Sequence, residues 1–480
     1  MAYPIPSSTG TLRDGGLGVL PEDTTQTSWK IGVSSAGTAG QVYTFRGTDT
    51  QSVVSSLGYG PLVDAIVAHL LKSGGKTVYA YKATASTAGS SSAVTKTGTS
   101  PNMTLTGTPI NYADGKVVIV AGGTLGTATF RYSLDGGDTY SDTIATAATY
   151  AIAEQGITLN FAAGSYVAGD YYTWVDTAPA MTNANLSDGL DDIIESPLEA
   201  AFVHVVGTPV DASAAATMTA TCQTKMEAAI AAKKYMFAVH GGAPVAASSM
   251  ITTYASVDAK FVVVAAGFCE YIDDRTGRIV KAPIDRLIAP RIARNPISVD
   301  LQRDVADSVL DPLAGIRQLV PTGALASTGY HDEAATPGLN AARFCSLYSI
   351  TGKSGYYVVN GHTMAASTSD FGLVQFVRVA LRAAQVFYLW SLDNLSQRIR
   401  KDPTTGYILP SVAQALEDDA TAALRAAVGQ HVDGVSVVIN RADNLSADPT
   451  LRYKIRLVGP AYAKTVEWEL GLVDALPEAA

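Results

Sequence analysis

The spacing of apolar residues near the start of the chain predicts a β-α-β unit over residues 28–90. Apolar and polar residues alternate over 29–33, and a period of two is typical of a β-strand. After Pro61, which the first turn of a helix tolerates, apolar residues recur every four positions and predict a helix. The glycine pair at 74–75 is expected to end that helix, and the run KTVYAYKA predicts the next strand.

A longer alternation of strands and helices over residues 185–320 predicts an α/β domain. The apolar runs AFVHVVG, KYMFAVHG and KFVVVAAG predict strands, separated by a helix after Asp211 and a shorter helix near 247–256. Strands that are apolar throughout are buried on both faces, which requires helices on each side of a parallel sheet. The expected fold class is therefore α/β in a mixed α+β, multidomain chain, with a three-layer core. The turn GTPVDAS lacks the glycines of a dinucleotide-binding loop, so no cofactor is expected.

Residues 101–178 predict a small inserted β-sandwich. The composition of residues 85–100 falls to Ser, Thr, Ala and Gly, as in a linker. The following stretch holds short alternating runs separated by Gly, Asp and Pro, with no long helix. The sequence Asp-Gly-Gly-Asp at 135–138 is expected to form a turn, because a calcium loop needs oxygen ligands at more regular positions. Polar turns and flexible linkers place this unit on the outer surface.

The last third predicts a C-terminal α+β domain over 325–450 that contains a long buried helix. The segment 373–400 is apolar nearly all round, and its polar residues from 375 to 385 are spaced so that they share one face. Between residues 371 and 401 there are five basic residues and one acid, which makes the segment positive within an acidic protein. The basic side chains either bind groups of the same subunit or meet an acidic partner. They are Arg378, Arg382, Arg398, Arg400 and Lys401.

The two ends of the chain are expected to exchange strands with other copies. Residues 1–27 have no apolar period and predict a flexible arm. In the C-terminal arm, 451–480, two runs with a period of two flank a Gly-Pro break, the first basic and the second acidic on its polar face. An isolated two-stranded ribbon is marginal in water, so it should recruit further strands, and residues 29–33 of another copy are a candidate. The residues assigned to this exchange are Trp29, Ile31, Val33, Tyr453, Ile455, Val466, Trp468 and Leu470.

Composition and charge narrow the functional classes. Only 16% of the 480 residues are charged, which indicates that copies of the chain cover part of its surface; a surface of small polar side chains is the alternative. The net charge of -9 and the lack of a basic run disfavour binding to nucleic acid. Neither a signal peptide nor an apolar stretch long enough to span a membrane is visible, and three distant cysteines predict no disulfide framework.

Motifs for catalysis or metal binding are incomplete. The run SITGKS at 349–354 resembles the end of a phosphate-binding loop, but the required first glycine would fall at Leu347. The triplet Asp-Phe-Gly at 370–372 has no kinase catalytic loop to accompany it. The six histidines lack metal-ligand spacing, and no Gly-x-Ser-x-Gly elbow occurs. No catalytic residue, cofactor site or metal site is therefore expected.

Three segments, in this order, resemble the contractile tail sheath proteins of phages and related injection systems. They run from SWKIGV to KTVYAYKA, from FVVVAAGFCEYIDD to IARNP, and from LNAARFCSLYS to VVNGHTM. The resemblance covers most of the chain except the β-rich insertion. Phe268 and Cys269 stand where many sheaths have Pro-Trp, and His362 where many have Arg, so the chain resembles a distant branch.

The resemblance implies a structural subunit rather than an enzyme. It implies stacked six-fold rings of this chain around a tail tube, with terminal arms adding strands to neighbours, and contraction that drives the tube through the host envelope for genome ejection. Baseplate and tail terminator proteins are further expected partners; nucleic acid and membrane insertion are not. The expected location is the virion tail, after assembly in the host cytoplasm. The five basic residues of segment 371–401 become candidates to face the tube. The alternative is a virion surface adhesin that binds through the insertion.

Overall fold

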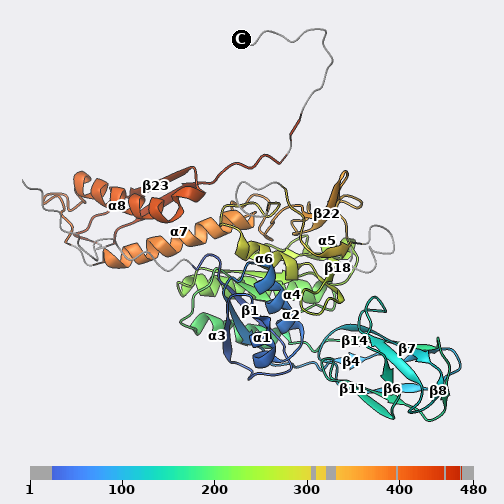
Figure 1. The fold of residues 1–480 in the computed structure, drawn as a ribbon. Helices are drawn as coiled ribbons and strands as arrows, with labels where there is room; N and C mark the ends of the chain where they lie inside the picture. Colours follow the sequence, from blue (N-terminus) through green and yellow to red (C-terminus); the bar gives the residue numbers. More distant parts are fainter. Residues whose placement is uncertain are drawn as a thin grey trace, which may run out of the picture.

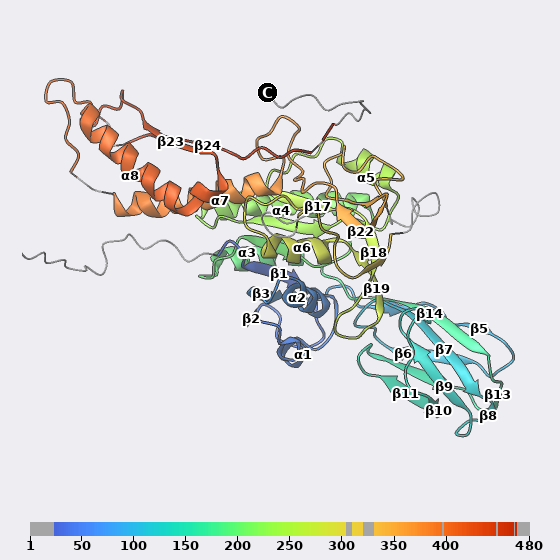
Figure 2. The same ribbon diagram turned by 45° about the horizontal axis from the view of Figure 1, so that its top comes forward.

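The structure is a computed structural model that describes residues 24–303, 310–319, 331–395, 398–447, 450–464 and 466–467. The described part is elongated: an α/β core lies in the middle, the β-rich insertion at one end and a C-terminal lobe at the other (Figure 1; Figure 2). Most of the arm expected at 1–27, and nearly all of the chain after residue 464, lie outside the described residues.

A six-stranded sheet forms the centre of the core, in the strand order β17-β16-β15-β1-β3-β2. Neighbouring strands are parallel except β2, which pairs antiparallel with β3 at one edge. The parallel strands are largely apolar because both of their faces are covered. The bounds are β1 Ser28–Gly32, β2 Val42–Phe45, β3 Val78–Lys82, β15 Phe202–Val205, β16 Phe237–Gly241 and β17 Val262–Ala265.

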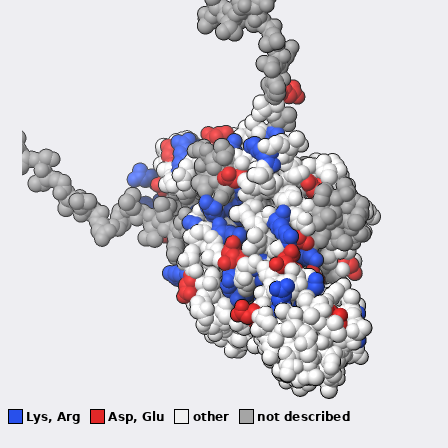
Figure 3. Space-filling model, turned by 45° about the vertical axis from the view of Figure 1, so that its right-hand side comes forward, with Lys and Arg blue, Asp and Glu red and all other residues white. Residues whose placement is uncertain are grey.

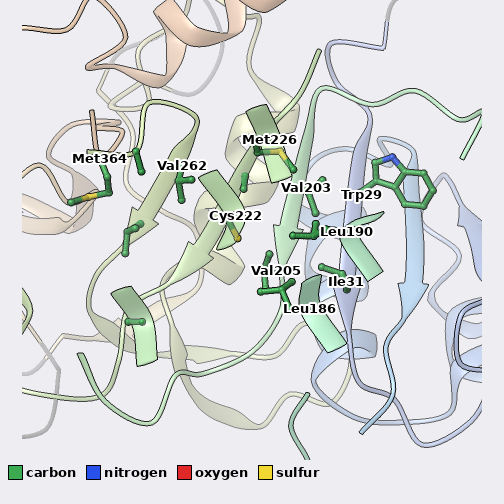
Figure 4. Packing of buried hydrophobic residues seen from close by; sticks show 14 of the residues in the cluster. Trp29, Ile31, Leu186, Leu190, Val203, Val205, Cys222, Met226, Val262 and Met364 are labelled. Carbon is green, nitrogen blue, oxygen red and sulfur yellow. The ribbon is translucent and has the colours of Figure 1, made fainter. Parts of the chain in front are cut away.

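Helices cover both faces of this sheet, which confirms the three-layer core predicted from the sequence. Their bounds are α1 Thr50–Leu57, α2 Pro61–Lys72, α3 Asn183–Glu195, α4 Ala212–Ala231, α5 Ala247–Tyr254 and α6 Asp285–Arg294. On one face, α3 and α4 contribute apolar side chains to the cluster that contains Trp29, Ile31 and Val203 (Figure 4). Helix α5 adds Met250 and Tyr254 to the same cluster. The other face is covered by α1, α2 and α6. The Asp211 side chain caps α4, as its place in the sequence predicts.

The insertion is a β-sandwich with its own hydrophobic core, which includes Phe130, Leu159 and Trp174. One sheet has the order β10-β9-β7-β14-β4, with β5 also paired to β14, and the other has the order β11-β12-β6; β8 and β13 form a short pair. Because β4 and β5 belong to the first sheet, the insertion begins near residue 90 rather than at 101, and the Ser/Thr-rich stretch is not only a linker. The bounds are β4 Ser90–Ser91, β5 Thr95–Thr97, β6 Met103–Gly107, β7 Ala113–Ala121, β8 Gly123–Thr124, β9 Thr129–Ser133, β10 Ile144–Ala145, β11 Thr149–Ile152, β12 Ile157–Phe161, β13 Ser165–Tyr166 and β14 Tyr171–Thr177.

Two small antiparallel sheets complete the core. The first has the order β19-β18-β20 and lies between the central sheet and the insertion (Figure 2). The second is the hairpin β21-β22, which contains the SITGKS run and so accounts for it as a turn between strands. The bounds are β18 Phe268–Ile272, β19 Ile279–Pro283, β20 Ile316–Gln318, β21 Leu347–Ile350 and β22 Lys353–Val358.

The C-terminal lobe consists of two long helices and a two-stranded ribbon. Its elements are α7 Val374–Asp393, α8 Pro410–Val428, a 3-10 turn Gly429–His431, β23 Gly434–Ile439 and β24 Tyr453–Val458. The helix predicted over 373–400 therefore ends seven residues early. Val379, Val386 and Leu424 from the two helices share a core with the inner face of the ribbon. Strand β24 pairs along its whole length with β23, so it belongs to this lobe rather than to a separate arm over 451–480.

Candidate functional site: assembly surfaces

The β23-β24 ribbon presents one apolar and one basic face. Tyr453, Ile455 and Leu457 point inward and pack against α7 and α8. Lys454 and Arg456 alternate with them and are exposed on the outer face. The period of two predicted for this strand is confirmed, but its partner is β23 and not the run after Pro460. The ribbon is thereby held by its inner face, while its outer face and both outer edges bind no other strand among the described residues.

The second predicted run, after Pro460, is described only in part. Val466 is 77% exposed and contacts no hydrophobic cluster of the described residues. Trp468 and Leu470 lie outside the described residues, so their assignment to strand exchange stays a prediction. Ahead of them, the Tyr462 hydroxyl donates to the Ser298 carbonyl at 2.5 Å, and Lys464 pairs with Asp300 at 2.5 Å. These two contacts fix the direction in which the chain leaves the lobe.

Strand β1 has no free edge for a strand of another copy. Trp29 and Ile31 are fully buried and Val33 is nearly so. The strand is hydrogen-bonded to β15 on one side and to β3 on the other. The expectation that residues 29–33 pair with the ribbon of a neighbour is therefore corrected: these residues build the centre of their own subunit.

The arginines of α7 bind groups of the same subunit. Arg378 is 3% exposed and donates to the carbonyl oxygens of Asn295, Pro296 and Thr25 at 2.9 to 3.2 Å. Arg382 is 9% exposed and donates to the Gln385 side chain at 2.8 Å. For these two residues the structure favours the intrasubunit alternative over a contact with an acidic partner.

The remaining three cations of the predicted positive segment are exposed. Arg398, Arg400 and Lys401 follow the end of α7 and lie at the surface, with Lys401 donating to the Ser446 hydroxyl at 2.6 Å. Ile399 packs against the same small cluster as Tyr453, which places this basic loop beside one end of the ribbon. The loop and the outer face of β24 together form a basic surface on the C-terminal lobe.

A buried chain of polar side chains crosses the core, and sequence reasoning missed it. Lys30 Nζ donates to His204 Nδ1 at 2.7 Å, and His204 Nε2 lies 2.9 Å from Asp285 Oδ2. Burial lowers the pKa of Lys30 to about 7 and raises the pKa of Asp285 to about 7. Burial also lowers the pKa of His204, which is neutral. The three side chains are at most 2% exposed, so no substrate reaches them.

The described residues offer little for catalysis or metal binding. Among them no group of His, Cys, Asp and Glu could hold a metal ion. Cys222, Cys269 and Cys345 are free and buried, and burial raises the pKa of each thiol. Asp135 lies in the turn after β9, where both carboxylate oxygens accept hydrogen bonds from Thr139, as expected for a turn. No helix in the described part of the chain has the length and apolar character needed to cross a membrane.

A cleft of about 340 Å³ lies where the insertion meets the core. Its walls carry acidic side chains from the insertion, among them Asp114 and Glu154, and basic ones from the turn between β18 and β19 and from β19, among them Arg278 and Lys281. On the face of the molecule shown in Figure 3, the surface of the insertion carries few charges.

Solved structures with this architecture come from the sheaths and a baseplate of contracted particles. The anti-feeding prophage baseplate in its contracted state contains a chain that is 13% identical, with a TM-score of 0.56, and the two chains cover 98% and 99% of each other. The anti-feeding prophage helical sheath in its contracted state is 10% identical, with a TM-score of 0.53 and 98% and 99% coverage. The contracted PVC sheath complex of an extracellular contractile injection system is 9% identical, with a TM-score of 0.53 and 98% coverage of both chains.

The chain therefore has the fold of contractile sheath proteins, which confirms the resemblance at the level of fold. A family model described as DUF2586, N-terminal domain, matches residues 7–362. This protein belongs to that family. No curated protein matches the chain.

Proposed function

We propose that this chain is the structural subunit of a contractile tail sheath. It polymerises with itself as stacked six-fold rings around a tail tube and contracts to drive the tube through the host envelope. The observation that carries this proposal is the likeness of nearly the whole chain, insertion included, to chains of two contracted sheaths. Each of these matches covers 98% of this chain. The expected partners are the tail tube, baseplate and terminator proteins, in the virion tail.

The β23-β24 ribbon supplies a physical basis for self-assembly. A two-stranded ribbon leaves a row of unpaired backbone groups on each outer edge, which another extended segment can complete. Tyr453 and Ile455 hold the ribbon on its inner face. Beyond Lys464, Val466 is exposed. In this proposal, residues 466–470 of one copy add to the ribbon of the next. The basic surface beside the ribbon meets an acidic tube.

Electron microscopy of the purified chain tests the proposal. A sheath subunit forms rings or long tubes without any other protein, and longer ones when the tube protein is added. A surface adhesin would form trimers or other small closed oligomers instead. A chain that stays monomeric at high concentration, with and without tube protein, would contradict the sheath proposal. Since the proposed role is structural, we expect no turnover of nucleotide during contraction.

A further inference from the structure

In the part of the chain that the structure describes, the insertion and the central α/β domain share no hydrophobic cluster. Its own core, residues 103–174, contains no residue of the central domain, and none of the other hydrophobic clusters of the described residues includes a residue of the insertion. Units joined in this way are expected to move relative to each other unless polar contacts hold them.

The covalent connection is a narrow two-stranded stalk. The backbone N–H groups of Ser86 and Thr87 both donate to the Ala180 carbonyl, and the Ala180 N–H donates back to Thr87. The two linkers therefore run side by side, and the insertion has a single pivot. A stalk of this width fixes the position of the insertion but not its angle to the core.

Three ion pairs join the insertion to the β19-β18-β20 sheet. Their nitrogen to oxygen distances are 2.5 to 2.7 Å, and every partner is between 21% and 44% exposed, so dissolved salt reaches all of them. The three cations lie in β19, in β20 and in the turn between β18 and β19. The three acids come from different parts of the insertion. The pairs are Arg278 with Glu154, Lys281 with Asp114, and Arg317 with Asp138.

Two hydrogen bonds from uncharged donors to carboxyl groups complete the same contact. The N–H of Ile279 donates to the Asp135 carboxylate at 3.3 Å, and the Asn111 side chain donates to Asp64 of α2 at 2.6 Å. Four of the seven acidic residues between 90 and 177 lie in this contact. More than half of the acidic side chains of the insertion therefore contact the core.

We propose that these ion pairs form a releasable clamp that sets the angle of the insertion on the core. When the pairs are screened or broken, the insertion swings about the stalk at 86–87 and 180 as a rigid body, because its own hydrophobic core stays intact. The inference concerns the single chain and does not depend on the proposed sheath function.

Distance measurements between spin labels test the clamp. Thr106→Cys on the insertion and Ala228→Cys on α4 provide exposed labelling sites, and the three native cysteines are buried. Labelled full-length chain is diluted into unlabelled chain, so that only distances within one subunit contribute. We expect one narrow distance at roughly 0.1 M salt, and a broader distribution or a second peak at roughly 1 M, where the screening length falls from about 10 Å to about 3 Å.

Two sets of variants decide the result. The triple variant Arg278→Gln, Lys281→Gln, Arg317→Gln should show the broad distribution even at low salt. The matched control Lys225→Gln removes a 2.5 Å pair with Asp191, away from the junction, and should keep the narrow distance. An unchanged narrow distance in the triple variant at both salt concentrations would overturn the clamp.

If the triple variant does not fold, variants that exchange the charges of Lys281 and Asp114 test the proposal instead. Lys281→Asp alone should broaden the distribution, and Lys281→Asp with Asp114→Lys should narrow it again, because the pair is restored with opposite polarity. Equal distributions for the single and double exchange variants would overturn the proposal.

Discussion

Lys30 and His204 are hydrogen-bonded in the interior of the central sheet, 174 positions apart in the sequence, with 2.7 Å between Lys30 Nζ and His204 Nδ1. Because this ring nitrogen accepts the bond from Lys30, the opposite nitrogen donates to Asp285 of α6. The neutral imidazole therefore connects the buried amino group of Lys30 to the buried carboxyl group of Asp285. The arrangement ties β1, β15 and α6 together in one geometry.

Replacing only Lys30 or only Asp285 should destabilise the subunit more than replacing both residues. Lys30→Met or Asp285→Leu alone leaves the other group buried without its partner, and we expect each to lower the free energy of unfolding by about 3 to 5 kcal/mol. The double variant Lys30→Met, Asp285→Leu should lose less than either single variant. Chemical denaturation followed by circular dichroism measures both. Additive losses would show that the two charges do not interact through His204.

The pH dependence of the free energy of unfolding should show the contribution of Lys30 apart from that of Asp285. Its pKa is about 7 in the folded chain against 10.5 for a free lysine, so between these values the unfolded chain holds a proton that the folded chain lacks. This group therefore makes the folded state more stable as the pH rises through that window. Asp285, with its pKa raised to about 7, gives the opposite trend below the window. From about pH 7.5 to about pH 9.5, the wild type should gain on the order of 2 kcal/mol relative to Lys30→Met in urea denaturation. Parallel pH profiles would contradict this.

The core was predictable from sequence because its signals are local. Strands β15, β16 and β17 are continuous apolar runs, and α2 and α4 carry their start signals at Pro61 and Asp211. Helices α1, α3, α6 and α8 were not predicted. Helix α3 buries Leu186, Leu190 and Ile193 along one face, so its apolar period is present in the sequence and was missed. The inward positions of α8 include two alanines and a glutamate, which weakens its apolar stripe.

The environment of charged residues was not predictable, because their partners are distant in sequence. Lys30 looked like the polar position of a half-buried strand, but His204 and Asp285 satisfy it inside the core. Arg378 was expected either to bind groups of its own subunit or to meet an acidic partner, and carbonyl groups near residues 25 and 295 accept its hydrogen bonds. Periodicity identifies which face a residue occupies, not what covers that face.

The insertion should be dispensable for folding of the core. Replacing residues 90–177 by a short Gly/Ser linker removes one hydrophobic cluster completely and cuts no other. We expect a soluble chain with unchanged helical circular dichroism that still assembles in electron micrographs. Precipitation of the remainder would show that the insertion contributes to the core. Removing only residues 101–178 is the matched comparison, because it leaves β4 and β5 without their partner β14 and should give a less stable chain.

The exposed basic loop should govern binding to the tube. Arg398→Glu, Arg400→Glu and Lys401→Glu together should weaken co-sedimentation with tube protein at low salt, and the difference from wild type should shrink at high salt. Arg425→Glu, at an exposed arginine of α8, shows the effect of a charge reversal outside this loop. Arg378→Leu should instead destabilise the subunit, since it removes three hydrogen bonds from the interior. Equal tube binding by the triple variant at both salt concentrations would remove this assignment.

The segment after Pro460 should be the polymerisation device. Strand β24 ends at Val458, so a chain truncated after Pro460 keeps the ribbon and its inner packing, and loses within the subunit mainly the contacts of Tyr462 and Lys464. Burial of Val466, Trp468 and Leu470 against a neighbour would contribute on the order of 5 to 9 kcal/mol before ordering costs.

We therefore expect this truncated chain to keep its circular dichroism spectrum and to sediment as a monomer under conditions where the full chain polymerises. A chain truncated after Thr450 provides the contrast: it also loses β24, exposes Val435 and Val437 of β23, and should unfold the C-terminal lobe. Rings or tubes of normal length from the chain that ends at Pro460 would show that assembly uses another surface. Loss of folding in that chain would show instead that the last twenty residues stabilise their own subunit.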